Sequence, residues 1–180
     1  MAEAVEKGIK RQTLYAMLDA QLIERLSRGV YRLKSMPILT NPDFVVTTIR
    51  IPKGIVCLIS ALAFHELTTE IPHAVDIAIE RGSETPRVNY PPINLYWFSG
   101  SAYEAGVEIH KIDGQDVRIY SAPKAIADAF KYRNKIGREI AVEALRAWLS
   151  KRKKNIGELL RFAKICRVES VMRPYIEAMI

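Results

Sequence analysis

Residues 8–33 constrain the fold more than any other part of the chain. Gly8 can adopt the backbone conformation of a sharp turn, and it precedes a polar-to-apolar stretch in which Leu14 and Leu18 recur at helical spacing. Two short β-type runs follow on either side of Ser27-Arg28-Gly29, a loop sequence typical of a hairpin. The order predicts helix, turn, helix and hairpin, which is the order of a winged helix-turn-helix, a unit that docks on DNA.

In such a unit the second helix presents its first residues to base edges, and the hairpin lies over phosphates. Arginine pairs favourably with guanine, and glutamine with adenine. The predicted DNA-binding residues are Lys10, Arg11, Gln12, Thr13 and Tyr15 on the helix and Arg25, Arg28 and Arg32 on the hairpin. The alternative is an ordinary helical pair and hairpin whose polar residues only face solvent.

The unit departs from the usual pattern at its start. Only residues 2–7 precede the turn, whereas three helices usually precede the hairpin, which is called the wing. We therefore predict a truncated winged helix-turn-helix over residues 1–36, with its first helix missing. Either the true start lies upstream, or the protein carries a trimmed and less stable DNA-binding unit. Pro37 and Pro42, with turn-forming residues between them, mark the entry to a larger domain over residues 37–180.

Charge is distributed unevenly around a net value of +7. Residues 1–35 hold seven Lys/Arg against four Asp/Glu, residues 36–120 six against ten, and residues 121–180 fourteen against six. A basic balance favours nucleic acid or an acidic protein as the partner. Cys57 and Cys166 lie in apolar, helix-like patterns, so we expect buried thiols and a reducing cytoplasm. There is no signal peptide, and the longest apolar run is too short for a membrane span.

The sequence of the larger domain predicts a mixture of helices and strands, followed by helices alone. We expect a helix over residues 55–67, strands over 75–80 and 93–99, and a loop over 81–89. Asp113-Gly114 predicts a hairpin between 107–112 and 116–120. Capping signals at Ser121 and Asn155 open helices beyond it, and Arg173-Pro174 predicts a kink or two shorter helices. The predicted class is α+β: a winged helix-turn-helix, then a larger mixed α/β domain ending in a helical bundle.

Catalytic and metal-binding patterns are weak. His65-Glu66 and His73 lack the spacing of a zinc motif, and no phosphate-binding or cofactor loop is present. Ser60, His65 and Asp76 are the residue types of a hydrolytic triad, but such residues occur in most domains. We expect no enzymatic activity, no metal and no cofactor.

A basic group of residues in the C-terminal third is the second candidate surface. It comprises Lys124, Asp128, Lys131, Tyr132, Arg133, Lys135 and Arg138, and the run Lys151-Arg152-Lys153-Lys154 follows it. This group either contacts nucleic acid or an acidic partner, or is a solvated helix face. Lys124 and Asp128 are also spaced to pair with each other.

Several motifs in order resemble the AbiEi antitoxins of type IV toxin–antitoxin, or abortive infection, systems. They are Ser60-Ala61-Leu62-Ala63-Phe64-His65-Glu66-Leu67-Thr68-Thr69, Ile71-Pro72-His73, Arg81-Gly82-Ser83, Phe98-Ser99-Gly100, Lys124 to Asp128, Phe130 to Lys135, and Met172-Arg173-Pro174-Tyr175. The resemblance implies an autorepressor that binds inverted repeats in double-stranded DNA at its own operon. It also implies a C-terminal domain that counteracts a cognate nucleotidyltransferase-like toxin. The rival hypothesis is a protein-interaction antitoxin whose N-terminal unit is vestigial and does not bind DNA.

Overall fold

The structure is a computed structural model that describes residues 8–180. It is a mixed α+β fold with a two-stranded and a five-stranded sheet. Within residues 8–180 the helices are α2 (Arg11–Asp19), α3 (Pro42–Arg50), α4 (Leu58–Phe64), α5 (Ser101–Glu104), α6 (Ala122–Lys131), α7 (Arg133–Ile136), α8 (Arg138–Leu149), α9 (Ile156–Ile165) and α10 (Glu169–Met179). The strands are β1 (Ile23–Ser27), β2 (Val30–Leu33), β3 (Ile55–Val56), β4 (Val75–Glu80), β5 (Ile93–Phe98), β6 (Val107–Ile112) and β7 (Gln115–Tyr120). The predictions about residues 2–7 and a missing first helix lie outside the described residues.

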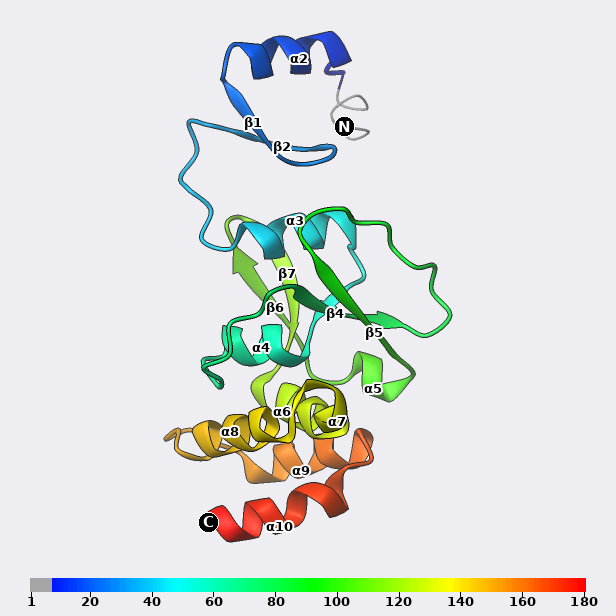
Figure 1. Ribbon diagram of the computed structural model, residues 1–180, viewed down its shortest axis with the longest axis vertical. Helices are drawn as coiled ribbons and strands as arrows, with labels where there is room; N and C mark the ends of the chain where they lie inside the picture. The colour runs from blue at the N-terminus through cyan, green and yellow to red at the C-terminus, as the bar shows by residue number, and fades with distance from the viewer. Residues whose placement is uncertain (1–7) are drawn as a thin grey trace.

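The N-terminal unit consists of α2 and the β1–β2 hairpin, at one end of the molecule (Figure 1). β1 and β2 pair antiparallel across Arg28-Gly29, and the predicted hairpin is confirmed. The glycine φ of 82° supplies the left-handed conformation of this tight turn. Leu14, Ile23 and Val30 are buried, so the unit encloses a small apolar core between helix and hairpin.

The five-stranded sheet has the order β5-β4-β3-β7-β6. β4 pairs parallel with β5 and antiparallel with β3, while β3 pairs parallel with β7. The predicted β6–β7 hairpin is confirmed, with positive φ at both Asp113 and Gly114. Neighbouring residues Ile55 and Val56 enter different buried clusters, as alternation along a strand requires.

Helices α6 to α10 occupy the end of the molecule opposite the N-terminal unit (Figure 1). α6 lies at the centre of this helical layer and contacts α4, α8 and α9. Its residues from Pro123 to Phe130 are all buried, and alanines allow the neighbouring helices to approach closely. Asn155 caps α9 by accepting a hydrogen bond from the Glu158 amide, as its sequence signal predicts.

Several element predictions are wrong in detail. Residues 55–67 are not one helix. Ile55 and Val56 form β3, because both pair with β4 and Val56 also pairs with Ile119 of β7, and α4 begins after Cys57. Helix α3 was not predicted, since its start at Pro42 resembles a loop; proline is well tolerated in a first helical turn.

The C-terminal helices need similar corrections. α10 is a single helix that runs through the exposed Pro174, so the alternative of two shorter helices is wrong. A short helix, α7, precedes α8, and Gly137 at φ 103° separates the two. Ser121 stands at the N-cap of α6 as predicted, but its hydroxyl makes no capping bond. No helix within residues 8–180 has the length and apolar character to cross a bilayer.

Candidate functional site

The first turn of α2 is a cationic, exposed surface. Lys10 occupies the N-cap position, Arg11, Gln12 and Thr13 follow, and each side chain is exposed. Tyr15 keeps 56% of its surface exposed. The first turn carries no acidic residue, so the positive end of the helix dipole and two basic side chains attract anions together. Within residues 8–180 no carboxylate forms an ion pair with Lys10 or Arg11, so this part of the surface is open to a polyanion.

The hairpin arginines separate into two kinds. Arg25 and Arg28 are exposed, with Arg28 in the turn itself. Arg32 differs, because its side chain is only 12% exposed and lies 3.0 Å from a Glu24 carboxylate oxygen. It also donates a hydrogen bond to the Met36 carbonyl at 2.6 Å. The expectation that Arg32 joins an exposed phosphate-binding wing is therefore corrected: its guanidinium is engaged within the protein.

The predicted basic surface of the C-terminal third is also smaller than expected. Lys131, Lys135 and Arg138 are exposed, whereas Tyr132 and Arg133 are half-buried. Lys135 Nζ lies 4.3 Å from the Tyr96 ring centroid, and Arg133 donates to the Phe130 carbonyl.

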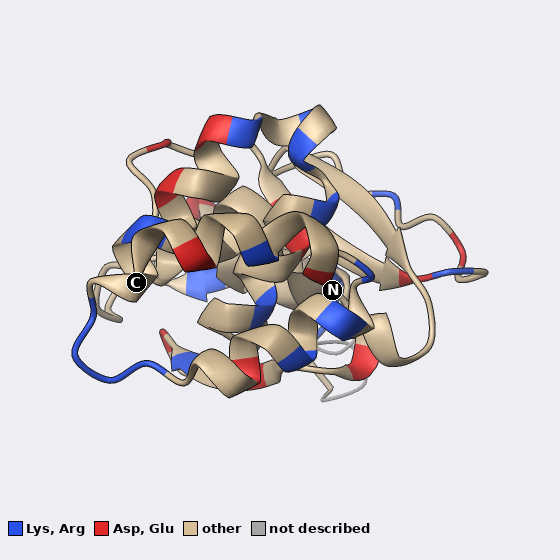
Figure 2. Ribbon diagram, turned by 90° about the horizontal axis from the view of Figure 1, so that it is seen from below, with Lys and Arg blue, Asp and Glu red and all other residues tan. Residues whose placement is uncertain are grey.

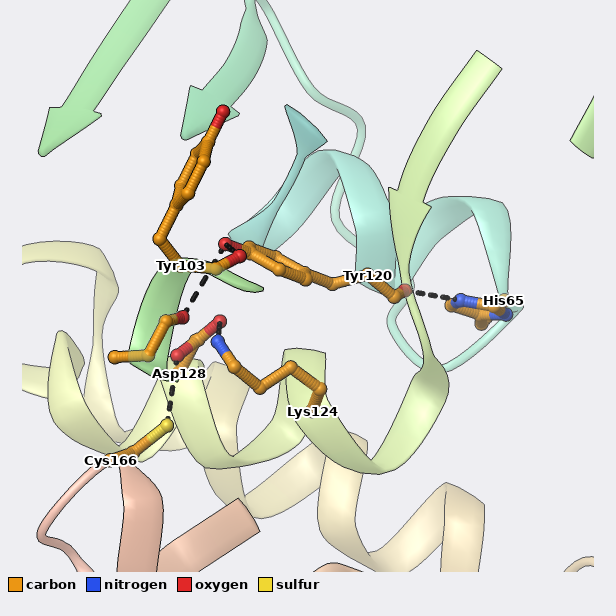
Figure 3. A network of polar contacts seen from close by, with 7 residues as sticks. His65, Tyr103, Tyr120, Lys124, Asp128 and Cys166 are labelled. Atoms are coloured by element: carbon orange, nitrogen blue, oxygen red, sulfur yellow. Dashed lines mark hydrogen bonds and ion pairs between the residues drawn. The ribbon is translucent and has the colours of Figure 1, made fainter. Parts of the chain in front are cut away.

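Lys124 and Asp128 do not belong to any surface. Both are fully buried, and Lys124 Nζ lies 2.5 Å from Asp128 Oδ2, so the pairing alternative is the correct one (Figure 3). Lys124 Nζ also lies 3.9 Å from the centroid of the Tyr120 ring. Burial raises the pKa of Asp128, and the nearby Lys124 ammonium acts against that shift. The pair is an internal element of the fold.

Two further side chains complete this buried network. The Cys166 thiol donates to Asp128 Oδ1 at 3.2 Å, and the Tyr120 hydroxyl donates to the Tyr103 carbonyl at 2.8 Å (Figure 3). Burial raises the pKa of Cys166 to about 12, which keeps the thiol protonated and a poor nucleophile. Cys57 is buried as well, so the prediction of two buried thiols is confirmed.

Ser60, His65 and Asp76 do not form a catalytic triad. Ser60 Oγ accepts the Asp76 amide at 2.9 Å, and the Asp76 carboxylate accepts the Ile59 amide in the first turn of α4. His65 Nε2 instead contacts the Tyr120 carbonyl at 2.8 Å, and burial lowers the pKa of this imidazole. Serine and aspartate thus hold the start of α4, while histidine ties its end to β7.

The basic run of residues 151–154 connects α8 to α9 (Figure 2). Lys151 Nζ donates to the His65 carbonyl at 2.8 Å, and Lys154 Nζ donates to the Leu149 carbonyl. These ammonium groups satisfy carbonyls at the C-terminal ends of α4 and α8. Only the middle of the run, Arg152 and Lys153, is left for an external partner.

Sequence reasoning missed two residues that join distant segments. Asp113 accepts three hydrogen bonds from Thr40 and Asn41, and Arg50 donates to the Arg87 carbonyl at 3.2 Å. The Asp113-Gly114 signal identified the turn, but no local pattern indicates which distant amides a turn carboxylate will meet. No protein-family model matches the chain, and no curated protein matches it.

Proposed function

We propose that the chain is the antitoxin of a type IV toxin–antitoxin system, similar to the AbiEi antitoxins, and that it also represses its own operon by binding DNA. Residues 1–36 serve as the winged helix-turn-helix and residues 37–180 as the antitoxin domain. The chain is not an enzyme and works in the cytoplasm. Its partners are inverted repeats in double-stranded DNA and a nucleotidyltransferase-like toxin.

One observation carries the DNA-binding half: exposed cations gather on a helix and the hairpin turn that follows it. α2 enters the major groove with its N-terminal turn, where Arg11 reads guanine and Gln12 reads adenine. Arg25 and Arg28 contact phosphates on the flanking backbone and fix the register of the unit. The absence of an acidic residue from the first turn of α2 supports this orientation.

The antitoxin half is supported by the charge of the C-terminal third. Lys131, Lys135 and Arg138 present exposed cations along the end of α6, α7 and the start of α8. They form the surface that meets the toxin or its nucleic-acid target. Lys124 and Asp128 have no part in this contact, because neither reaches the surface.

The test is a fluorescence-anisotropy titration of the full chain against its own upstream DNA and a scrambled duplex at physiological salt. We expect tight binding only to the upstream DNA, with an affinity that falls steeply as salt rises. Arg11→Ala should lose about 1–3 kcal/mol of discrimination at one base pair, which is roughly five- to 150-fold in affinity. Arg161→Ala, a charge-matched change at an exposed arginine of α9, should bind like the wild type.

A specific observation favours the second candidate, a protein-interaction antitoxin with a vestigial N-terminal unit. Arg32 is withdrawn from the hairpin surface, which leaves the wing with two exposed arginines. On this hypothesis both duplexes bind weakly and equally. A Lys10→Ala/Arg11→Ala/Arg28→Ala variant would then still neutralise the toxin in cells as well as the wild type does.

A further inference from the structure

The segment that joins the N-terminal unit to the rest of the chain is held at both ends. This linker covers residues 34–41. At its start Arg32 donates to the Met36 carbonyl at 2.6 Å, while Glu24 holds the other side of the guanidinium. At its end the Asp113 carboxylate accepts the amides of Thr40 and Asn41 at 2.9 and 3.1 Å. The Thr40 hydroxyl adds a third hydrogen bond to Asp113, at 3.0 Å.

Asp113 is suited to this contact by its place in the fold. It lies in the β6–β7 turn, and Asn41 is the N-cap residue of α3, so the carboxylate meets the positive end of that helix. The backbone amides of Asn41 and Thr40 lower the pKa of Asp113, and the Arg32 charge adds to the effect. Arg32 and Asp113, which both bind the linker, therefore also attract each other electrostatically.

Two further hydrogen bonds cross the same junction from the hairpin itself. Ser27 Oγ donates to the Tyr90 carbonyl at 2.9 Å. Arg50, at the end of α3, donates to the Arg28 carbonyl in the hairpin turn at 3.5 Å and to the Arg87 carbonyl at 3.2 Å. The turn that carries a proposed phosphate contact is thus tied to the body of the protein.

Apolar packing closes this junction only in part: Val30 of the hairpin and Val45 of α3 are buried, but the side chains around them are not. A groove of about 520 Å³ lies between the hairpin, the linker, α3 and the β6–β7 turn. Leu33, Met36, Ile38 and Ile49 around it keep 42% or more of their surface exposed. A poorly packed interface leaves the relative orientation of its two sides to the directional polar bonds.

We propose that Arg32 and Asp113 are positioning residues that fix the direction in which the N-terminal unit presents α2 and the hairpin turn. When the hydrogen bonds of either residue to the linker are lost, the N-terminal unit stays folded but changes its orientation relative to the rest of the chain. The consequence for DNA recognition rests on the proposed function, whereas the fixed orientation does not.

The orientation can be measured without DNA. Spin labels at Ala16→Cys on α2 and Glu177→Cys on α10 occupy exposed positions, while the native Cys57 and Cys166 are at most 1% exposed. Pulsed dipolar spectroscopy on the full chain should give one narrow distance peak. Asp113→Gly removes the carboxylate yet suits the left-handed backbone (φ 50°), so it should lose the single peak while the thermal melting curve stays cooperative.

Three further variants make the result decisive. Asp113→Asn keeps an acceptor and tolerates the same backbone, so it should restore the narrow peak. Arg32→Ala should broaden the distribution by releasing Met36. Asp116→Ala removes a carboxylate from the same hairpin that has only a 3.9 Å contact with Lys111, and it should leave the peak unchanged. A narrow wild-type peak that persists in Asp113→Gly would overturn the proposal.

DNA binding is measured separately from the spin-label distance, so that the two proposals can fail independently. If wild-type protein fails to prefer its upstream DNA while Asp113→Gly still broadens the distance, the proposed function fails and the positioning role stands. If the wild type prefers its upstream DNA and Asp113→Gly broadens the distance distribution, Asp113→Gly should bind that DNA more weakly than Asp116→Ala does. The reason is that a unit with no fixed orientation loses that freedom on binding, and this loss reduces the affinity.

Discussion

The least expected residues of this fold are Lys124 and Asp128, a fully buried ion pair in the central helix of the C-terminal layer. Taking two charges out of water costs several kcal/mol for each, and only close contact and further hydrogen bonds repay it. Both conditions are met: the pair is 2.5 Å apart, the Cys166 thiol donates to the second carboxylate oxygen, and the Tyr120 ring covers the ammonium. Each partner is therefore stabilising only in the presence of the other.

Lys124→Met is predicted to lower the free energy of unfolding by about 3–5 kcal/mol, because it leaves the buried Asp128 carboxyl group without its ammonium partner. A Lys124→Met/Asp128→Leu double variant should recover much of that loss. Urea unfolding at neutral pH measures both effects. Lys131→Met, two turns along the same helix and exposed, is the control, and an equal loss in Lys131→Met and Lys124→Met would contradict the prediction.

Sequence alone located these residues but not their surroundings. The spacing of Lys124 and Asp128 allows a pair, but their place in a cluster of basic residues predicts a surface. The prediction that Arg32 is exposed is wrong because the sequence does not show its contacts. Its partners Glu24 and Met36 are determined by the strand pairing of the hairpin and by the path of the linker. The exposed residues of α2 agreed with expectation, because amphipathic spacing alone determines which side of a short helix faces its core.

At the scale of elements, one glycine determines how closely α6 approaches the start of β6. Gly106 immediately precedes β6 with a φ of 74°, and a Cβ atom placed there would lie 2.7 Å from Lys124 Cβ. Gly106→Ala therefore combines a left-handed alanine, at about 1–2 kcal/mol, with overpacking of about 1–3 kcal/mol.

Gly114→Ala is the matched comparison for Gly106→Ala. Gly114 has a φ of 82° but nothing within 4 Å of the added Cβ, so only the backbone strain applies. Urea unfolding of the two variants should show the larger loss for Gly106→Ala. Equal losses would mean that the α6 layer yields easily at this point.

Helices and strands that depend on residues close in the sequence could be predicted, and those that depend on distant pairing partners could not. The β1–β2 and β6–β7 hairpins and the α9 cap follow from turn and capping residues a few positions apart. Strand β3 has two residues, too few for any periodicity, and exists because β4 and β7 lie on either side of it. Helix α3 begins with a proline that is equally typical of a loop.

At the scale of the whole molecule, carboxylates join its successive parts. Asp113 ties the linker to the sheet, and Glu143 on α8 ties the helical layer to the segment after α4. Glu143 Oε1 accepts the Thr69 amide and hydroxyl, both at 2.9 Å, and Oε2 accepts the Thr68 hydroxyl at 3.1 Å. The Thr69 amide is the main reason that the pKa of Glu143 is lowered.

A lowered carboxyl pKa gives the stabilising effect of Glu143 a definite dependence on pH. The stabilisation is complete above the unfolded-state pKa, about 4.3 for a glutamate, and is lost as the pH falls through the lower folded-state value. Glu143→Gln should therefore be less stable than the wild type near neutral pH, and the gap should narrow in acid. Urea unfolding in parallel at about pH 7 and pH 3.5 measures this difference, because these two pH values lie on either side of the unfolded-state pKa. Glu177→Gln, whose parent side chain is exposed and only 4.0 Å from Arg173, should show no such change. A gap for Glu143→Gln that stays constant with pH would mean that its hydrogen bonds do not depend on the charge.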